Sequence, residues 1–377
     1  NINQIMPNNN NLLSGQINPI QNRKMRPNSS NNIKVNEELI IINPCTKGLV
    51  NVGATCYMNA TLQCLAHVEK LTKYLLKPSK MQNILSNKYK YRLTSSYIEV
   101  LKNLWLNNTI CRDSPDAFNN IISQMNPLFS GIQANDSKDL ILFLMETMDN
   151  ELNTGPKINI SNQNQVNQYD YQTMLKIFAN YYLNNYNSII SNLFYGSYNS
   201  MMKCLNCNVI AHNIQCFNIL IFPLEEVRKF KNKINEVNII DCFEYYQKEE
   251  LISGANQIYC NRCNTMANSL NSSKLITGPK VLVIILNRGI GMQYNVKLKF
   301  EEYIDIKKFI NSKESPIFYE LIGVVAHFGP SSMSGRFIAF CKSFVDNKWY
   351  KYNDAQVNPT SFREVCNAGV PHILFYS

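Results

Sequence analysis

The sequence predicts an α+β fold, because helix-like patterns fill its first half and strand-like patterns fill its second half. Apolar residues recur every three or four positions in segments 55–76 and 137–152, as in helices with one buried face. From about Leu193 onward the apolar runs are short, which is typical of strands. These runs are 219–224, 281–286, 318–326, 337–344 and 373–376.

The composition describes a globular chain that is long enough to bury a large core. Of its 377 residues, 45% are hydrophobic and 17% are charged. The net charge is +10, but lysines and arginines are scattered, and the densest cluster, 228–233, adjoins Glu225 and Glu226. We therefore expect a solvated basic surface and no nucleic-acid partner. We also expect no membrane partner, since the longest aliphatic run falls far short of the roughly 20 residues that span a bilayer.

The twelve cysteines do not have the pattern of a secreted disulfide framework. The chain is long, shows no cleavable apolar leader, and has two cysteine pairs with metal-ligand spacing. We therefore expect a reducing location, either cytoplasmic or nuclear. Asn rather than Met at position 1 indicates a piece of a longer protein.

Two stretches are too rich in asparagine and other polar residues to contribute to a core. Residues 1–43 are predicted to form a flexible tail, and residues 159–172 an exposed loop. The folded domain is therefore expected to begin at about residue 44.

A candidate nucleophile, Cys56, begins the first predicted helix. A thiol at a helix N-terminus faces unpaired N–H groups and the positive end of the helix dipole, which favour its thiolate. The side-chain amide of Asn51 is available to an oxyanion, and Gly48 and Gly53 allow a tight backbone turn. The alternative is an ordinary buried cysteine.

A second candidate site is formed by two pairs with Cys-x-x-Cys spacing. They are Cys204 with Cys207 and Cys260 with Cys263. Four thiolates at this spacing suit tetrahedral zinc, and we expect a structural zinc site here. A redox role is less well supported, because it does not need two separate pairs.

Several blocks resemble the ubiquitin-specific protease family, in the same order. Segment 48–63 resembles the family's cysteine box, and segment 136–140 resembles its Asp-Ala-Gln-Glu-Phe element. Segments 319–337 and 349–354 resemble its histidine box, and the paired cysteines match its fingers.

The resemblance, over residues 44–377, implies a papain-like cysteine-protease fold with three subdomains. These are a thumb at about 44–160, zinc-stabilised fingers at about 195–275 inserted in the palm, and a palm at about 276–377. It also implies hydrolysis of the isopeptide bond after the C-terminal glycine of ubiquitin, with ubiquitin and ubiquitin-conjugated proteins as partners.

The same resemblance assigns roles to individual residues. It implies that Cys56 is the nucleophile, Asn51 the oxyanion donor and Asn353 the group that orients the base, and the following Asp354 also matches. Asp136 and Asp139 are implied to grip the basic tail of ubiquitin, although acids at a helix N-terminus are also favoured for local reasons. Phe337 and His327 are implied to lie on the substrate-binding surface.

The position of the general base holds Arg336, seventeen residues before Asn353. A guanidinium stays protonated, so Arg336 cannot accept the thiol proton, although it can stabilise a thiolate. Of the four histidines in the chain, only His327 is a candidate substitute, and a structural role is its alternative.

Two functions from different classes follow from this departure. The chain is either a ubiquitin-specific thiol protease slowed by Arg336, or an inactive ubiquitin-binding scaffold. A third reading, a protease for another ubiquitin-like modifier, stays open.

Overall fold

The computed structural model describes residues 41–107, 113–131, 135–156, 170–289, 291–311, 315–331, 334–367 and 369–377. The predicted tail lies outside these ranges except for residues 41–43. The predicted loop at 159–172 also lies outside them, except for residues 170–172. Among the described helices, none is long and apolar enough to span a membrane.

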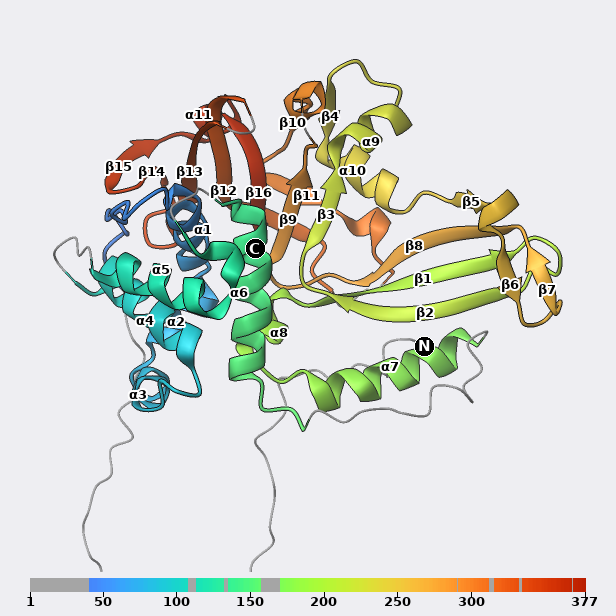
Figure 1. Ribbon diagram of the computed structural model, residues 1–377, viewed down its shortest axis with the longest axis horizontal. Helices are drawn as coiled ribbons and strands as arrows, with labels where there is room; N and C mark the ends of the chain where they lie inside the picture. The colour runs from blue at the N-terminus through green and yellow to red at the C-terminus, as the bar shows by residue number, and fades with distance from the viewer. Residues whose placement is uncertain are drawn as a thin grey trace, which may run out of the picture.

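The first half of the chain is helical, as predicted, and its described helices except the one at Tyr171–Asn185 lie in the left-hand part of Figure 1. Its helices are α1 (Cys56–Ala66), α2 (Glu69–Leu76), α3 (Pro78–Ser86), α4 (Arg92–Trp105), α5 (Asp113–Met125) and α6 (Ser137–Leu152), followed by α7 (Tyr171–Asn185) and α8 (Ile189–Phe194). The prediction of a helix at 137–152 is confirmed.

The prediction of one helix over 55–76 is wrong, because the chain forms two helices, α1 and α2. At the break, the last carbonyl of α1 has side-chain partners. The carbonyl of Ala66 accepts hydrogen bonds from the side chains of Thr72, at 2.8 Å, and Trp105, at 3.2 Å. These donors replace the backbone N–H groups that a continuing helix would supply.

The second half contributes an eight-stranded sheet, and the five predicted strand-like runs match five of its strands. Its path is β15-β14-β13-β12-β16-β9-β3, and β11 pairs with β12. The bounds are β3 (Leu220–Pro223), β9 (Leu282–Asn287), β11 (Tyr303–Asp305), β12 (Phe318–Ser331), β13 (Ser334–Lys342), β14 (Trp349–Asn353), β15 (Gln356–Thr360) and β16 (Val370–Tyr376). Only β3 and β9 pair in parallel among these described strands.

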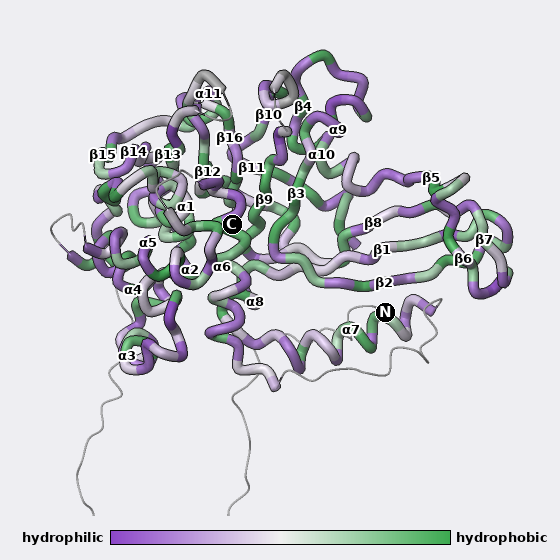
Figure 2. The backbone as a smooth tube through the Cα atoms, viewed as in Figure 1, coloured by the Kyte–Doolittle hydropathy of each residue, from purple (hydrophilic) through white to green (hydrophobic). Residues whose placement is uncertain are grey.

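Both faces of this sheet are buried, which explains the continuous apolar run at 281–286. Along β9, Val283 and Ile285 pack in the core on the side of α1, whereas Leu282 and Ile284 pack in the core on the side of α9 and α10. Successive side chains of a strand point to opposite faces, so a strand covered on both faces needs apolar residues at every position. Figure 2 shows the resulting hydrophobic band along the central strands.

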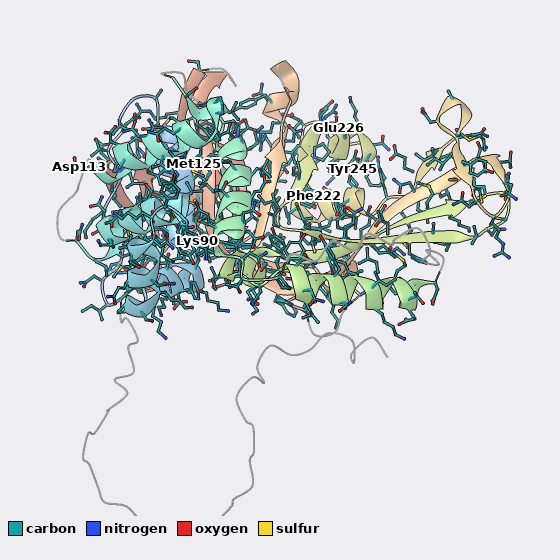
Figure 3. The ribbon with its side chains drawn as sticks, turned by 60° about the horizontal axis from the view of Figure 1, so that its bottom comes forward. Lys90, Asp113, Met125, Phe222, Glu226 and Tyr245 are labelled. Carbon is teal, nitrogen blue, oxygen red and sulfur yellow. The ribbon has the colours of Figure 1, made fainter. Side chains whose placement is uncertain are left out.

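The second core covers the face away from α1. It includes α9 (Leu224–Phe230), α10 (Ile239–Tyr246), α11 (Phe362–Asn367), and the parallel pair β4 (Glu236–Asn238) and β10 (Lys297–Lys299). Phe222 and Tyr245, labelled in Figure 3, pack in this layer. Residues 220–246 fall inside the range predicted for the fingers, yet they pack on the eight-stranded sheet. The subdomain boundaries themselves stay a prediction.

A long ribbon extends from the sheet to the right of Figure 1. It is a sheet of order β2-β1-β8-β5, with the hairpin β6–β7 at its end. The bounds are β1 (Gly196–Cys204), β2 (Ile210–Phe217), β5 (Glu250–Ile252), β6 (Ile258–Cys260), β7 (Thr265–Ala267) and β8 (Ser269–Thr277). Helix α7 runs beside it and packs Leu175 and Phe178 against Ile214 and Ile276.

Candidate active site

Cys56 is the first residue of α1, as the sequence predicts. Every residue of α1 is buried, since the helix lies between the helical lobe and β12, β13 and β14. The Cys56 side chain is 8% exposed, and its Sγ accepts a hydrogen bond from the backbone N–H of Phe337 at 3.5 Å. The thiol therefore lies at the contact between a helix N-terminus and a strand of the sheet.

Charge and burial act on this thiol in opposite directions. Burial raises the pKa of Cys56, and the Asp354 carboxylate raises it further. The Phe337 N–H and the Arg336 guanidinium lower it, but the net pKa is above that of an ordinary cysteine. The expectation of a favoured thiolate is thus offset by the burial of Cys56.

Asn51 organises the loop that precedes α1. Its Oδ1 accepts hydrogen bonds from Gly53 N at 3.1 Å, Thr55 N at 3.2 Å and Thr55 Oγ1 at 3.2 Å. The loop turns through left-handed backbone at Gly53 (φ +127°) and Ala54 (φ +49°). Asn51 Nδ2 donates to Asp354 Oδ2 at 3.1 Å, which leaves the second N–H of this amide for another acceptor.

Asp354 joins the end of β14 to the loop and to α1. Its Oδ1 accepts from Asn59 Nδ2 at 2.8 Å, and its carbonyl accepts from Leu49 N at 3.0 Å. Gly48 lies so close that an added Cβ would be 2.1 Å from the Asp354 carbonyl oxygen. Asn59 is a site residue that sequence reasoning missed, although it is part of the recognised box.

Arg336 and Asn353 are in contact, as their spacing in the sequence predicts. Arg336 Nη1 donates to Asn353 Oδ1 at 3.1 Å, and the Arg336 side chain is exposed. The next residue after Arg336 is Phe337, whose N–H contacts Cys56. The structure therefore gathers the thiol, the guanidinium, the Asn353 amide and the Asp354 carboxylate at one place.

His327 belongs to a buried polar network beside this place. It is 5% exposed, pairs with Phe337 across β12 and β13, and its ring lies 5.0 Å from the Phe337 ring. Tyr294 Oη lies 2.7 Å from His327 Nδ1 and 3.2 Å from His372 Nε2. Burial lowers the pKa of both histidines, which favours their neutral forms. Tyr294 and His372 carry no sequence signal for this pairing.

Asp136, which precedes α6 in the helical lobe, lies beside His372 at the edge of this network. It caps α6 by accepting from Lys138 N at 2.9 Å, pairs with Lys138 Nζ at 3.1 Å, and lies 3.9 Å from His372 Nδ1. Burial opposes ionisation, but these partners lower the pKa of Asp136 to about 2. Asp139 is in the first turn of the same helix, and burial together with Asp136 raises its pKa. The predicted local role of Asp136 at a helix N-terminus is confirmed.

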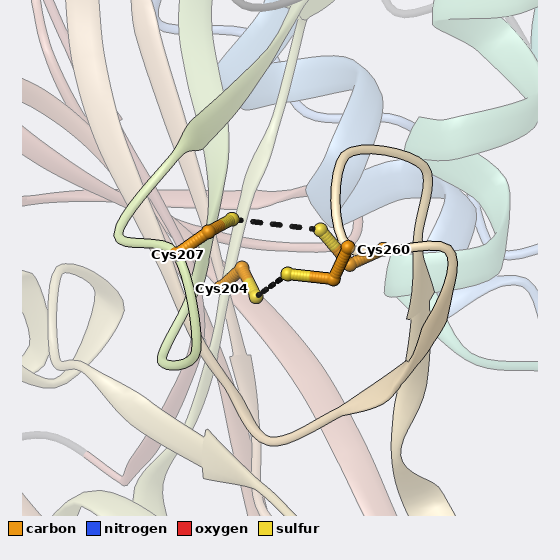
Figure 4. Close-up of side chains that lie close together, drawn as sticks. Cys204, Cys207 and Cys260 are labelled. Carbon is orange, nitrogen blue, oxygen red and sulfur yellow. Dashed lines mark hydrogen bonds between the residues drawn. The ribbon is translucent and has the colours of Figure 1, made fainter.

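The four paired cysteines come together at the end of the ribbon, between the β1–β2 and β6–β7 turns. All four sulfurs lie within 4.8 Å of one another, with Cys204 Sγ 3.9 Å from Cys263 Sγ and Cys207 Sγ 3.8 Å from Cys260 Sγ (Figure 4). Tetrahedral coordination with metal–sulfur bonds of about 2.3 Å separates sulfurs by about 3.8 Å. The donor set therefore fits a metal ion.

The two cysteine turns have the same backbone conformation. In each, an asparagine after the second cysteine adopts left-handed backbone, at Asn208 (φ +58°) and Asn264 (φ +54°). The N–H of each asparagine returns to the carbonyl of the first cysteine, at 2.9 Å and 2.8 Å. This closes each turn around the sulfurs.

A family model described as ubiquitin carboxyl-terminal hydrolase matches residues 47–376. This chain belongs to the ubiquitin carboxyl-terminal hydrolase family. Ubiquitin carboxyl-terminal hydrolase 2 of Bos taurus is 27% identical over 342 residues, covering 87% of this chain and 54% of the relative. Ubiquitin carboxyl-terminal hydrolase Usp2 of Drosophila melanogaster is 25% identical over 338 residues, covering 87% of this chain and 34% of that protein. The chain spans about half the length, or less, of these relatives.

Solved structures of the family share the fold. The SAGA DUB module of Ubp8, Sgf11, Sus1 and Sgf73 bound to monoubiquitin gives a TM-score of 0.64 at 22% identity, covering 90% of this chain and 70% of that one. The same module bound to ubiquitin aldehyde gives a TM-score of 0.63 at 21% identity, with the same coverage. The predicted α+β, papain-like fold with thumb, palm and fingers is thereby confirmed.

Proposed function

We propose that this chain is the protease domain of a ubiquitin-specific thiol protease whose catalysis is impaired by an arginine at the position of the general base. Membership of the hydrolase family supports this assignment, as does the gathering of Cys56, Asn51, Arg336 and Asn353. Ubiquitin as the partner is supported by the ubiquitin-bound structures of the same fold.

In the proposed reaction, the Cys56 thiol gives its proton to water and Sγ attacks the carbonyl carbon of the last glycine of ubiquitin. The C–N bond to the lysine breaks, the amine takes a proton from water and leaves, and a thioester remains. Water then hydrolyses the thioester, which frees the glycine carboxylate and the Cys56 thiol. The free N–H of the Asn51 amide and the backbone N–H groups at the start of α1 stabilise the oxyanion. Hydrogen bonds from Gly53 and Thr55 to Asn51 Oδ1 fix the direction of that amide.

One observation carries the impairment: Arg336 Nη1 donates to Asn353 Oδ1 at 3.1 Å. Asn353 is the proposed orienting group, and the residue that it contacts is Arg336. The Arg336 guanidinium is a cation without a lone pair, so it cannot accept the thiol proton. Arg336 lowers the pKa of Cys56 and so favours the thiolate, but it cannot protonate the leaving amine. Loss of a general acid–base group costs about 10²- to 10⁴-fold in rate.

His327 does not replace the missing base in this proposal. Its Nδ1 is engaged by Tyr294, and its ring is buried against the Phe337 ring. These contacts favour a packing role for His327, which supports Phe337 on β13. Phe337 is the side chain proposed to lie beside the ubiquitin tail.

The two acids at the start of α6 are proposed to bind the basic tail of ubiquitin. The lowered pKa of Asp136 keeps its carboxylate ionised, and Asp139 lies one turn away on the same helix. The Asp136 carboxylate lies 3.9 Å from His372 Nδ1, and the His372 ring lies 5.2 Å from the Phe337 ring.

The metal of the ribbon is proposed to be zinc with a structural role. Cys204, Cys207, Cys260 and Cys263 would hold it, and it would supply folding energy to a part of the chain with a small core. Their short strands and turns bury few apolar side chains of their own.

Multiple-turnover cleavage of a ubiquitin–lysine isopeptide conjugate tests the proposal. The native chain is compared with Arg336→His, and Cys56→Ala serves as the inactive control. We expect Arg336→His to cleave at least about 100-fold faster than the native chain. Equal rates for these two proteins, both above Cys56→Ala, would refute the impairment.

The same arginine favours a second function, an inactive ubiquitin-binding scaffold. The turnover assay separates the protease from the scaffold. Only a protease cleaves the conjugate faster than the Cys56→Ala control. A ubiquitin probe with a C-terminal electrophile reports whether the Cys56 thiolate still reacts, because labelling needs no leaving-group protonation. Absence of both ubiquitin binding and labelling would overturn both functions, and parallel probes of other ubiquitin-like modifiers test the third reading.

A further inference from the structure

Arg336 brings a permanent positive charge to the Cys56 thiol. The backbone N–H of the next residue, Phe337, donates to Cys56 Sγ at 3.5 Å. The guanidinium is fixed from the neighbouring strand, because Arg336 Nη1 donates to Asn353 Oδ1 at 3.1 Å. Burial raises the pKa of Cys56, and the charge of Arg336 acts on the same thiol in the opposite direction. A cation that cannot titrate is therefore held where the proposed reaction occurs.

The guanidinium has N–H groups that the described part of the chain does not use. It carries five, and Asn353 accepts one of them. The Asp354 carboxylate, which follows Asn353, binds two amides instead of Arg336. Its Oδ2 accepts from Asn51 Nδ2 at 3.1 Å, and its Oδ1 accepts from Asn59 Nδ2 at 2.8 Å. The Arg336 side chain is exposed, so its remaining N–H groups are open to a ligand.

The ligand group that meets Arg336 depends on the state of ubiquitin. In the function proposed above, the carbonyl carbon of the terminal glycine lies at Cys56 Sγ. In a conjugate this carbon belongs to a neutral isopeptide group, whereas in free ubiquitin it belongs to a carboxylate that is ionised at pH 7. Guanidinium and carboxylate form strong, parallel N–H···O bonds, which a neutral amide cannot match.

We propose, on the basis of that function, that Arg336 makes this site selective for ubiquitin with a free C-terminal carboxylate over ubiquitin joined to a lysine. The carboxylate accepts from the unused N–H groups of Arg336 and from the second N–H of the Asn51 amide. Asp354 opposes this pairing by its charge, but the Asn51 and Asn59 amides already bind its two oxygens. The chain therefore retains the product of isopeptide hydrolysis and prefers free ubiquitin to conjugates.

The test compares ubiquitin with ubiquitin whose terminal glycine ends in a primary amide. The amide has nearly the same size as the carboxylate and is neutral, as an isopeptide is. Isothermal titration calorimetry measures the Kd of each for the native chain at pH 7, and mass spectrometry checks that the amide stays intact. We expect the carboxylate form to bind about tenfold more tightly at about 50 mM NaCl. The preference should shrink at about 0.5 M NaCl, because salt screens an exposed ion pair.

Two variants assign the preference to one side chain. Arg336→Gln is expected to weaken binding of the carboxylate form about tenfold and to leave binding of the amide form within about twofold. Arg363→Gln is the matched control, since Arg363 is exposed on α11, which packs on the face of the sheet away from α1. It makes the same change in net charge and should keep the native preference.

The outcomes separate this inference from the function on which it rests. Equal binding of the two ubiquitin forms by the native chain, or an undiminished preference in Arg336→Gln, would overturn the inference and leave ubiquitin binding intact. Binding of neither form, with no labelling of Cys56 by the electrophilic probe, would overturn the proposed function as well. Because Arg336 is exposed, Arg336→Gln is expected to fold, and the native comparison tests the inference without it.

Discussion

The buried histidine at the end of α1 makes the stability of this fold sensitive to acid. His67 is 1% exposed, its Nδ1 donates to the Gln63 carbonyl at 2.7 Å, and its Nε2 lies 3.0 Å from the Tyr352 hydroxyl. Burial lowers the pKa of His67 to about 4, against 6.5 for an unperturbed histidine. Between these pH values His67 is mainly protonated in the unfolded chain and mainly neutral in the folded chain.

The sign and size of the effect follow from this difference in proton binding. The folded-state pKa is depressed, so the contribution is fully present above pH 6.5 and is lost as pH falls toward 4. At pH 5, about 1.5 pH units below the ordinary histidine pKa, protonation of His67 stabilises the unfolded state by about 2 kcal/mol. His67→Gln removes this titration and keeps a polar side chain at the site.

The assay is urea unfolding at pH 7 and pH 5, followed by tryptophan fluorescence. Trp105 is a suitable reporter, since its ring lies 5.3 Å from the His67 ring. We expect the native chain to lose about 2 kcal/mol more than His67→Gln on going from pH 7 to pH 5. His212→Gln is the control, because His212 is only partly buried and lies on the ribbon. An identical pH dependence for the native chain and His67→Gln would refute the reasoning.

Three further predictions concern the site and the ribbon. Cys207→Ser removes one ligand of the proposed zinc site, so it is expected to lose the metal and to lower the melting temperature of the ribbon, as we expect a zinc chelator to do to the native chain. Cys366→Ser should keep the metal, as metal analysis and thermal melts will show. Gly48→Ala places a Cβ 2.1 Å from a backbone oxygen, so we expect a loss of about 2 kcal/mol or more in urea unfolding; Gly53→Ala, with open space but φ +127°, should cost less. Tyr294→Phe removes the hydroxyl between two buried histidines and is expected to cost about 1–2 kcal/mol and to move the imidazole resonances of His327 in NMR; unmoved resonances would contradict that contact.

Local patterns in the sequence were enough to determine several features. Asp136 before an apolar helical repeat sets the start of α6, and two Cys-x-x-Cys pairs define the turns whose four sulfurs could hold a metal ion. The box around Cys56 places a thiol at the first residue of α1. Caps, turns and ligand spacings depend on residues a few positions apart, so one stretch of sequence contains the whole signal.

The tertiary structure alone decided the features that depend on distant partners. The Ala66 carbonyl at the end of α1 accepts a hydrogen bond from Trp105, which is far away in the sequence, as well as from the nearby Thr72, and the Trp105 contact exists only in the folded chain. Burial at the contact with β13, rather than the helix N-terminus, sets the direction of the Cys56 pKa shift. The pairing of Tyr294 with two histidines likewise arises where segments far apart in the chain pack together, as does the burial of Arg288 Nη2 without a hydrogen-bond partner among the described residues. Desolvation depends on everything that surrounds a group, and those surroundings exist only once the chain has folded.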